Sequence, residues 1–115
     1  MKDDLLGTLE DMHRAAHGLQ TDTNLNFAQE QFAQSITEEM QTLIDMVIAL
    51  PEDWWGEMRA VFSFEARSHL TSIIGYAEML LDESDGPLDD DQMALAQAIA
   101  RSGRTLLATL AALEG

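Results

Sequence analysis

The chain has no cysteine and only two prolines among its 115 residues. Without cysteine, a disulfide framework and a thiolate metal site are both excluded. The scarcity of proline leaves long stretches free to form helices, and no alternating run of β-branched residues indicates a strand. The expected fold class is therefore all-α, and the length suits one modest core.

Basic residues are also scarce, with six lysines and arginines against 21 acidic residues and a formal net charge of −15. The six are scattered along the sequence, whereas contacts to phosphates need cations gathered on one face. Binding to nucleic acid or to an anionic membrane surface is therefore not expected. The acidity by itself indicates only a well-solvated surface.

No stretch of the sequence approaches the roughly 20 consecutive apolar residues that a membrane-spanning helix needs. The first residues, M-K-D-D-L-L, also lack the apolar centre of a secretory signal peptide. From these two absences we expect a cytoplasmic location.

Apolar residues recur at intervals of three and four along most of the chain, which predicts four helices. The polar residues 20–26 form the first expected loop, and Leu50–Pro51 interrupts the pattern because the residue before a proline avoids helical geometry. The Gly-Pro pair within 84–88 predicts a tight turn, and Asp89–Asp91 suit the start of the last helix. The expected helices are Lys2–Leu19, Phe27–Ala49, Glu52–Glu83 and a fourth that ends near Leu113.

The last three of these helices carry apolar residues on one face only, so each must bury that face against other helices. By itself this pattern indicates a helical hairpin or bundle and no particular function. The predicted stripe residues are Phe32, Ile36, Met40, Leu43, Val47 and Leu50 in the second helix, Phe62, Ala66, Leu70, Ile73, Ile74, Ala77, Leu80 and Leu81 in the third, and Leu95, Ile99, Leu106, Leu110 and Leu113 in the fourth.

The segment from Ser63 to Leu81 reads S-F-E-A-R-S-H-L-T-S-I-I-G-Y-A-E-M-L-L. It resembles the phosphoacceptor helix of sensor histidine kinases, whose S-H-E-L-R-T-P-L box carries the phosphorylated histidine. The D-G-P-L sequence at 85–88 and the R-S-G-R-T-L-L run at 101–107 are similar to the turn and second helix of that family, in the same order. The resemblance implies a kinase-like dimerisation hairpin over residues 51–115, preceded by an N-terminal helical segment over residues 1–50.

Members of that family dimerise as four-helix bundles, so the resemblance implies a homodimer. It also implies a partner from two-component signalling, either a response-regulator receiver domain or a sensor kinase. Four helices within one chain could instead close an intramolecular bundle, which would make the protein monomeric.

Phe64 occupies the position of the family's acceptor histidine and has no nucleophile to take up a phosphoryl group. At about 100° per residue, Phe64 lies roughly 140° from the centre of the apolar stripe, so it should face solvent or a partner. Thr71, Gly75 and Asp82 fall on the same outer face, with Ser68 close by. The resemblance implies that this face docks the receiver domain, which makes these five the predicted partner-binding residues.

Two enzymatic alternatives stay open beside this non-catalytic interpretation. Glu65 and Ser68 stand where family members carry an acidic residue and a water-orienting Thr or Asn, which would suit a receiver phosphatase. A phosphotransferase could use His69 as a displaced acceptor, or His17, whose R-A-A-H-G-L context is similar to a short motif of histidine phosphotransfer domains. A further alternative is a purely structural oligomerisation domain.

His13 and His17 lie four residues apart and share a helix face, which makes them candidates for binding a metal ion. Two histidines without a third firm ligand are more often solvated side chains. No cofactor is expected, because the seven glycines are isolated and form no phosphate-binding loop. Autokinase activity is not expected either, since no ATP-binding domain follows the hairpin within this sequence.

Two adjacent tryptophans, Trp54 and Trp55, follow the proline of the second loop. Neighbouring helical residues point about 100° apart, so both cannot enter one core. We expect one to pack against the first two helices and the other to lie in an interface, or both to cover the end of the bundle.

Overall fold

The structure is a computed structural model that describes residues 2–51 and 59–114. These residues form four α-helices and no strand, so the predicted all-α fold class is confirmed. The predicted start of the third helix at Glu52 lies outside the described residues, as do Trp54 and Trp55. The helices are α1 (Lys2–Gln20), α2 (Phe27–Ala49), α3 (Arg59–Leu81) and α4 (Asp90–Glu114).

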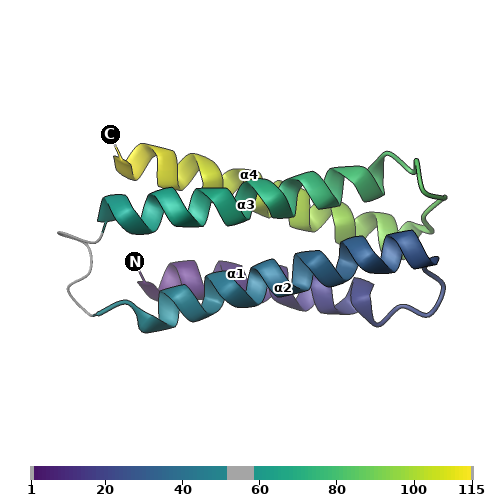
Figure 1. The fold of residues 1–115 in the computed structure, drawn as a ribbon, viewed down its shortest axis with the longest axis horizontal. Helices are drawn as coiled ribbons and strands as arrows, with labels where there is room; N and C mark the ends of the chain where they lie inside the picture. Colours follow the sequence, from purple (N-terminus) through teal and green to yellow (C-terminus); the bar gives the residue numbers. More distant parts are fainter. Residues whose placement is uncertain (1, 52–58, 115) are drawn as a thin grey trace.

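The four helices lie side by side along their lengths, and the start of α1 and the end of α4 lie at the same end (Figure 1). Among the described residues, α1 packs on α2 and α4, and α3 packs on the same two helices. Each helix therefore has two neighbours, and one chain supplies all four helices of a bundle. A second copy is not needed to cover the apolar stripes, and dimerisation stays a prediction.

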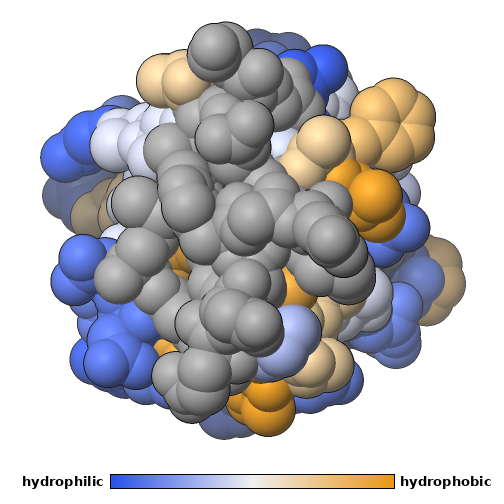
Figure 2. Space-filling model, turned by 90° about the vertical axis from the view of Figure 1, so that its left-hand side faces the viewer, coloured by the Kyte–Doolittle hydropathy of each residue, from blue (hydrophilic) through white to orange (hydrophobic). Residues whose placement is uncertain are grey.

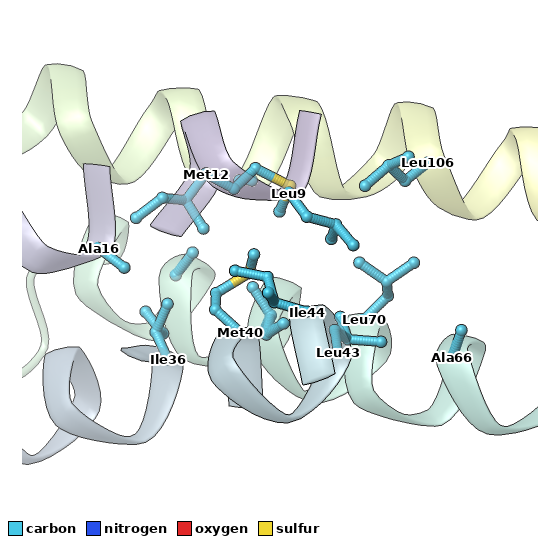
Figure 3. Packing of buried hydrophobic residues seen from close by; sticks show 14 of the residues in the cluster. Leu9, Met12, Ala16, Ile36, Met40, Leu43, Ile44, Ala66, Leu70 and Leu106 are labelled. Atoms are coloured by element: carbon cyan, nitrogen blue, oxygen red, sulfur yellow. The ribbon is translucent and has the colours of Figure 1, made fainter. Parts of the chain in front are cut away.

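The predicted stripes form the core, together with apolar residues of α1 that point into the same space (Figure 3). From Phe62 to Leu80, the predicted stripe residues of α3 are all buried, and Leu81 packs against the core from its edge. Phe32 and Leu95 are also edge residues, whereas the side chain of Leu113 lies outside the described part. Burying a Leu or Ile side chain contributes roughly 1.5–3 kcal/mol, which makes this core the main source of stability.

The loops before α2 and α4 each end in a capping box that fixes where the next helix begins. The Asn26 side chain accepts a hydrogen bond from the Gln29 amide at 2.9 Å, and the Gln29 side chain accepts one from the Asn26 amide at 3.0 Å. Asp89 and Gln92 repeat this arrangement at the start of α4, with distances of 2.7 and 2.9 Å. The predicted role of Asp89 as a cap is confirmed.

The same amide side chains also join the two loops at one end of the bundle. The Asn26 Nδ2 donates to the carbonyl oxygen of Asp85, and the Gln29 Nε2 donates to that of Gly86 at 3.0 Å. Gly86 has a φ of 138°, and a Cβ there would lie 2.7 Å from the Asn26 Nδ2. Glycine is therefore required at this point by both the backbone and the space.

The α3 helix ends at Leu81, two residues before the approximate end predicted at Glu83. Glu83 takes a left-handed backbone conformation, with a φ of 57°. Its amide bonds back to the carbonyl oxygen of Leu80 at 3.1 Å, which closes the last turn. Asp82 therefore follows the helix and does not belong to it.

Ile74 of α3 packs tightly over Gly103 of α4. A Cβ at position 103 would lie 2.8 Å from the Cγ1 of Ile74, closer than two carbon atoms can sit. Gly103 is buried, and its missing side chain is the space that Ile74 fills. The contact between Ile74 and Gly103 fixes the lengthwise position of α3 relative to α4.

Candidate functional site

The most unusual surface lies on the side of α3 that points away from the core. We call it the α3 outer face and define it by Val61, Phe64, Ser68, Thr71, Gly75 and Met79. In the described part of the chain, five large hydrophobic side chains are exposed, and three belong to this face: Val61 at 54%, Phe64 at 70% and Met79 at 46%. Apolar groups gathered on an exposed helix are typical of interaction sites.

Figure 2 looks onto the end of the bundle at which α1 begins and α4 ends. Hydrophilic side chains cover most of the visible rim, and hydrophobic ones interrupt it in a few places. The hydrophilic surface is expected for a chain of net charge −15, so the exposed apolar residues of α3 stand out against it.

A shallow depression lies in the middle of the α3 outer face, lined by Phe64, Arg67, Ser68, Thr71 and Ser72. The Thr71 hydroxyl donates to the carbonyl oxygen of Arg67 at 2.8 Å, and the Ser72 hydroxyl donates to that of Ser68 at 3.3 Å. These hydroxyls bond to the backbone of their own helix, so the depression combines a small polar floor with an exposed aromatic ring. Such a surface suits close packing of another protein more than binding of a charged small molecule.

Gly75 leaves a notch in this face. A Cβ built at position 75 would meet no atom within 4 Å, so neither neighbouring helix requires a glycine here. Glycine in the middle of a helix costs roughly 0.5–1 kcal/mol relative to alanine. Nothing inside the chain therefore requires glycine at position 75, and the missing side chain leaves room for a neighbouring molecule to approach the helix.

The α3 helix also differs from the rest of the chain in charge. It carries two arginines, at 59 and 67, and two glutamates, at 65 and 78, so its formal net charge is zero. The α2 helix has the same length, but carries four acidic residues and no lysine or arginine. The α3 outer face is therefore the part of this acidic protein that repels a negatively charged partner least.

The five predicted partner-binding residues lie on the surface, as their helical positions predicted. Phe64, Ser68 and Thr71 are exposed and Gly75 is half-buried, while Asp82 is exposed just beyond the end of α3. That they bind a partner stays a prediction.

Val61 and Met79 were not predicted as site residues, although both are exposed on the same face. The same count of about 100° per residue places each of them roughly 60° from Phe64, so helical geometry could have found them. Neither residue belongs to the predicted apolar stripe, which gave a further signal that both are exposed.

His69 lies on the flank of α3 that faces α2, away from the α3 outer face. Its Nδ1 is in hydrogen-bonding contact with the Oε2 of Glu39 on α2, and both side chains are about 30% exposed. This contact joins the two helices. It gives His69 a structural role that does not need phosphoryl transfer.

Glu65 and Ser68, the residues considered for a phosphatase, line different hollows. Ser68 lines the depression beside Phe64. Glu65 lines a separate apolar groove between the end of α2 and the start of α3, with Met46 and Leu50 among its neighbours. Glu65 and Ser68 are three residues apart on α3, so their side chains are neighbours on its surface, and their use in a phosphatase stays a prediction.

The two histidines of α1 are distant in sequence from the residues that line these hollows. Their side chains differ in exposure. His13 is half-buried and His17 is exposed. Across residues 2–51 and 59–114, no three His, Cys, Asp or Glu side chains gather closely enough to hold a metal ion. None of the helices in these ranges is long and apolar enough to cross a membrane.

The chain matches no family model, no curated protein and no solved structure. The resemblance to histidine kinases therefore depends on the motifs quoted above and on their order along the chain.

Proposed function

We propose that this protein is a non-catalytic, histidine-kinase-like module that binds a receiver domain or a sensor kinase and modulates two-component signalling. The observation that carries the proposal is the exposure of Phe64. An aromatic side chain stands where the resemblance implies a phosphorylated histidine, and 70% of it is open to solvent. Phe64 differs from the other exposed phenylalanine, Phe27, because it shares its helix face with exposed Val61 and Met79, and grouped apolar residues support a role in binding.

Phe64 would act as an apolar anchor in the complex. Aromatic residues are frequent among the few side chains that carry most of the energy of a protein interface. A phenyl ring fills the space of an imidazole, but offers no nitrogen that can be phosphorylated. The protein would occupy the docking surface of its partner and withhold it from an active kinase.

The surroundings of Phe64 support the same role. Ser68, Thr71 and Gly75 are small, so the backbone of α3 is accessible to a partner over two turns. Met79 lies at the far end of the face and adds a flexible apolar contact. The absence of a net charge on α3 reduces the electrostatic cost of bringing another domain close.

The test is a titration of isolated receiver domains and sensor-kinase dimerisation domains, from the organism that carries this chain, against the wild type and two variants. Phe64→Asp should weaken binding about 100-fold or more, because a charge replaces the anchor at the centre of the interface. Phe27→Asp is the matched control, since Phe27 is 77% exposed at the start of α2 and outside the α3 outer face. It should bind as tightly as the wild type.

Both variants should keep the helical circular dichroism spectrum of the wild type, because neither ring is buried. Equal affinities of wild type and Phe64→Asp would refute the role of Phe64. A wild type that binds none of the domains at micromolar concentration would refute the proposed function as a whole.

A further inference from the structure

We infer that two copies of this protein pair through their α3 outer faces, with the two α3 helices antiparallel. Four of the six residues of this face form two pairs that are symmetric about the point between Thr71 and Ser72, whereas Val61 and Thr71 would lie opposite Asp82 and Ser72. Phe64 and Met79 are equally far from that point on either side, and so are Ser68 and Gly75. A symmetric arrangement of this kind is what a twofold interface needs, because each contact then occurs twice.

The twofold axis would bring complementary side chains together. With the axis between Thr71 and Ser72, Phe64 of one copy lies over Met79 of the second copy, and the sulfur of methionine packs favourably on an aromatic ring. Ser68 lies against Gly75 of the second copy. The notch at Gly75, which no contact inside the chain explains, is then filled by the approaching helix.

The sizes of the side chains along α3 also fit two crossing antiparallel helices. The small residues Ser68, Thr71 and Gly75 lie near the axis, where two crossing helices come closest, and the large residues Phe64 and Met79 lie further out. Small residues at a crossing point permit a short distance between helix axes. Large residues beyond it add apolar area where the helices diverge.

Charge favours the α3 helix over the other three as the meeting point. Two chains of net charge −15 repel each other, and only α3 has equal numbers of basic and acidic residues. In the antiparallel arrangement, Arg67 of one copy also comes close to Glu78 of the second, on the edge of α3 that faces α4. Glu78 already pairs with Arg104 within its own chain, so the interface would place one carboxylate between two cations.

This dimer differs from the one that the resemblance to histidine kinases implies. There, the core faces of two hairpins are shared between copies, whereas here α1 and α2 of the same chain cover the core face of α3. A contact between single helices buries less than the roughly 1,200–2,000 Å² of a standard stable interface, so the association is weak and reversible. Because the α3 outer face is also the proposed docking surface, self-association and partner binding exclude each other; this consequence depends on the proposed function.

The first test is sedimentation equilibrium of the full chain at increasing concentration and at two salt concentrations. The average mass should rise from the 12.7 kDa of a monomer toward twice that value. High salt should strengthen the association, because it screens the repulsion between two acidic chains. A docking partner with basic residues would show the opposite dependence on salt.

Two glutamine substitutions provide a matched pair for this measurement. Gly75→Gln fills the notch and should weaken self-association at least tenfold. Gly7→Gln is the control, because Gly7 is also a helical glycine with no atom within 4 Å of an added Cβ, but lies on α1. A wild type that stays monomeric throughout, or a Gly75→Gln variant that associates as strongly as Gly7→Gln, would overturn the inference.

Single cysteines test the direction of the helices, since the chain has no cysteine of its own. Thr71→Cys lies beside the axis and should form a disulfide between copies quickly. Val61→Cys lies at one end of the face, far from its counterpart in an antiparallel pair, and should cross-link much more slowly. Equal rates would exclude the antiparallel arrangement. A protein that dimerises but binds no receiver or kinase would refute the proposed function and leave this inference standing, and the reverse result would refute only the inference.

Discussion

The α2 and α3 helices are neighbours of equal length, and they bury their inner faces in the same core, but their outer faces differ. Along α2, polar side chains pair with each other one turn apart: Gln34 donates to Glu38 at 3.1 Å, and Gln41 donates to Asp45 at 2.9 Å. Large apolar residues are exposed only near its two ends, at Phe27 and Ile48. Along α3, the exposed surface consists mainly of apolar and small residues.

The comparison separates what the fold needs from what it does not. A solvated helix surface with local pairs, as on α2, is sufficient to keep a bundle helix stable and soluble. The α3 outer face departs from that pattern in three ways at once: exposed Phe64 and Met79, an unexplained glycine at 75, and no net charge. Folding accounts for none of these, which is why we assign binding to this face.

The largest effect should come from restoring the histidine that the resemblance implies. Phe64→His should become phosphorylated when mixed with a phosphorylated receiver or an active sensor kinase that the wild type binds, while the wild type stays unlabelled. Phe64 is exposed, so an imidazole there would be accessible. The measurement is an acid-labile, alkali-stable radioactive label on the protein.

Phe27→His is the control on α2 and should stay unlabelled. A label on the wild type would instead favour His17 or His69 as acceptor. No label on Phe64→His, with a partner that demonstrably binds it, would contradict the assignment of this position.

Truncating a buried side chain should lower stability by a similar amount on α2 and on α3. Leu43 on α2 and Leu70 on α3 are each only 1% exposed. Leu43→Ala and Leu70→Ala should each lower the free energy of unfolding by about 2–5 kcal/mol, because each leaves a cavity in the core. Ser68→Ala on the outer face should change it by less than about 0.5 kcal/mol. Urea denaturation measures the free energy of unfolding of all three variants. An unchanged value for Leu70→Ala would mean that α3 does not pack as described.

The contact between His69 and Glu39 joins the two helices and should have an intermediate effect. A double-mutant cycle with His69→Ala and Glu39→Ala should give a coupling free energy of about 1 kcal/mol, because both side chains are partly shielded from water. Arg104 and Glu78 form the comparison pair, with side chains 56% and 49% exposed. Their coupling should stay below about 0.5 kcal/mol. Equal couplings would show that shielding does not strengthen the α2–α3 contact.

The smallest effect should come from the two helical glycines with open space around them, Gly7 and Gly75. Gly7→Ala and Gly75→Ala should each raise the free energy of unfolding by about 0.5–1 kcal/mol, since alanine favours helix and neither Cβ meets an obstacle. Thermal or urea unfolding of both variants measures this. A destabilising Gly75→Ala would mean that the glycine serves the fold, and would remove one reason to place a binding partner there.

The inner faces of α2, α3 and α4 could be predicted because burial leaves apolar residues at regular helical intervals. The pattern could not show which helices cover them, since a stripe of Leu and Ile packs equally well against a second copy or against α1. The contact between His69 and Glu39 spans 30 residues of sequence. No local pattern contains the alignment of α2 against α3, so this contact could not be predicted.

The outer face of α3 could be predicted only in part. Helical geometry placed Phe64 outside the core, and the resemblance to histidine kinases drew attention to it. Met79 is exposed only because of its position on the helix, and an apolar residue is assigned to the core by default. The early end of α3 depends on the left-handed conformation of Glu83, a residue type that gives no such signal.

The contact of Ile74 with Gly103 has a consequence for how this protein can carry information. To slide or to turn against α4, the α3 helix would have to lift Ile74 out of the space over Gly103, where a side chain at position 103 would collide with it. A hairpin held in one alignment cannot relay a mechanical displacement from one end to the other. Under the proposed function, signalling by this protein would therefore depend on occupancy, that is, on which protein is bound and for how long.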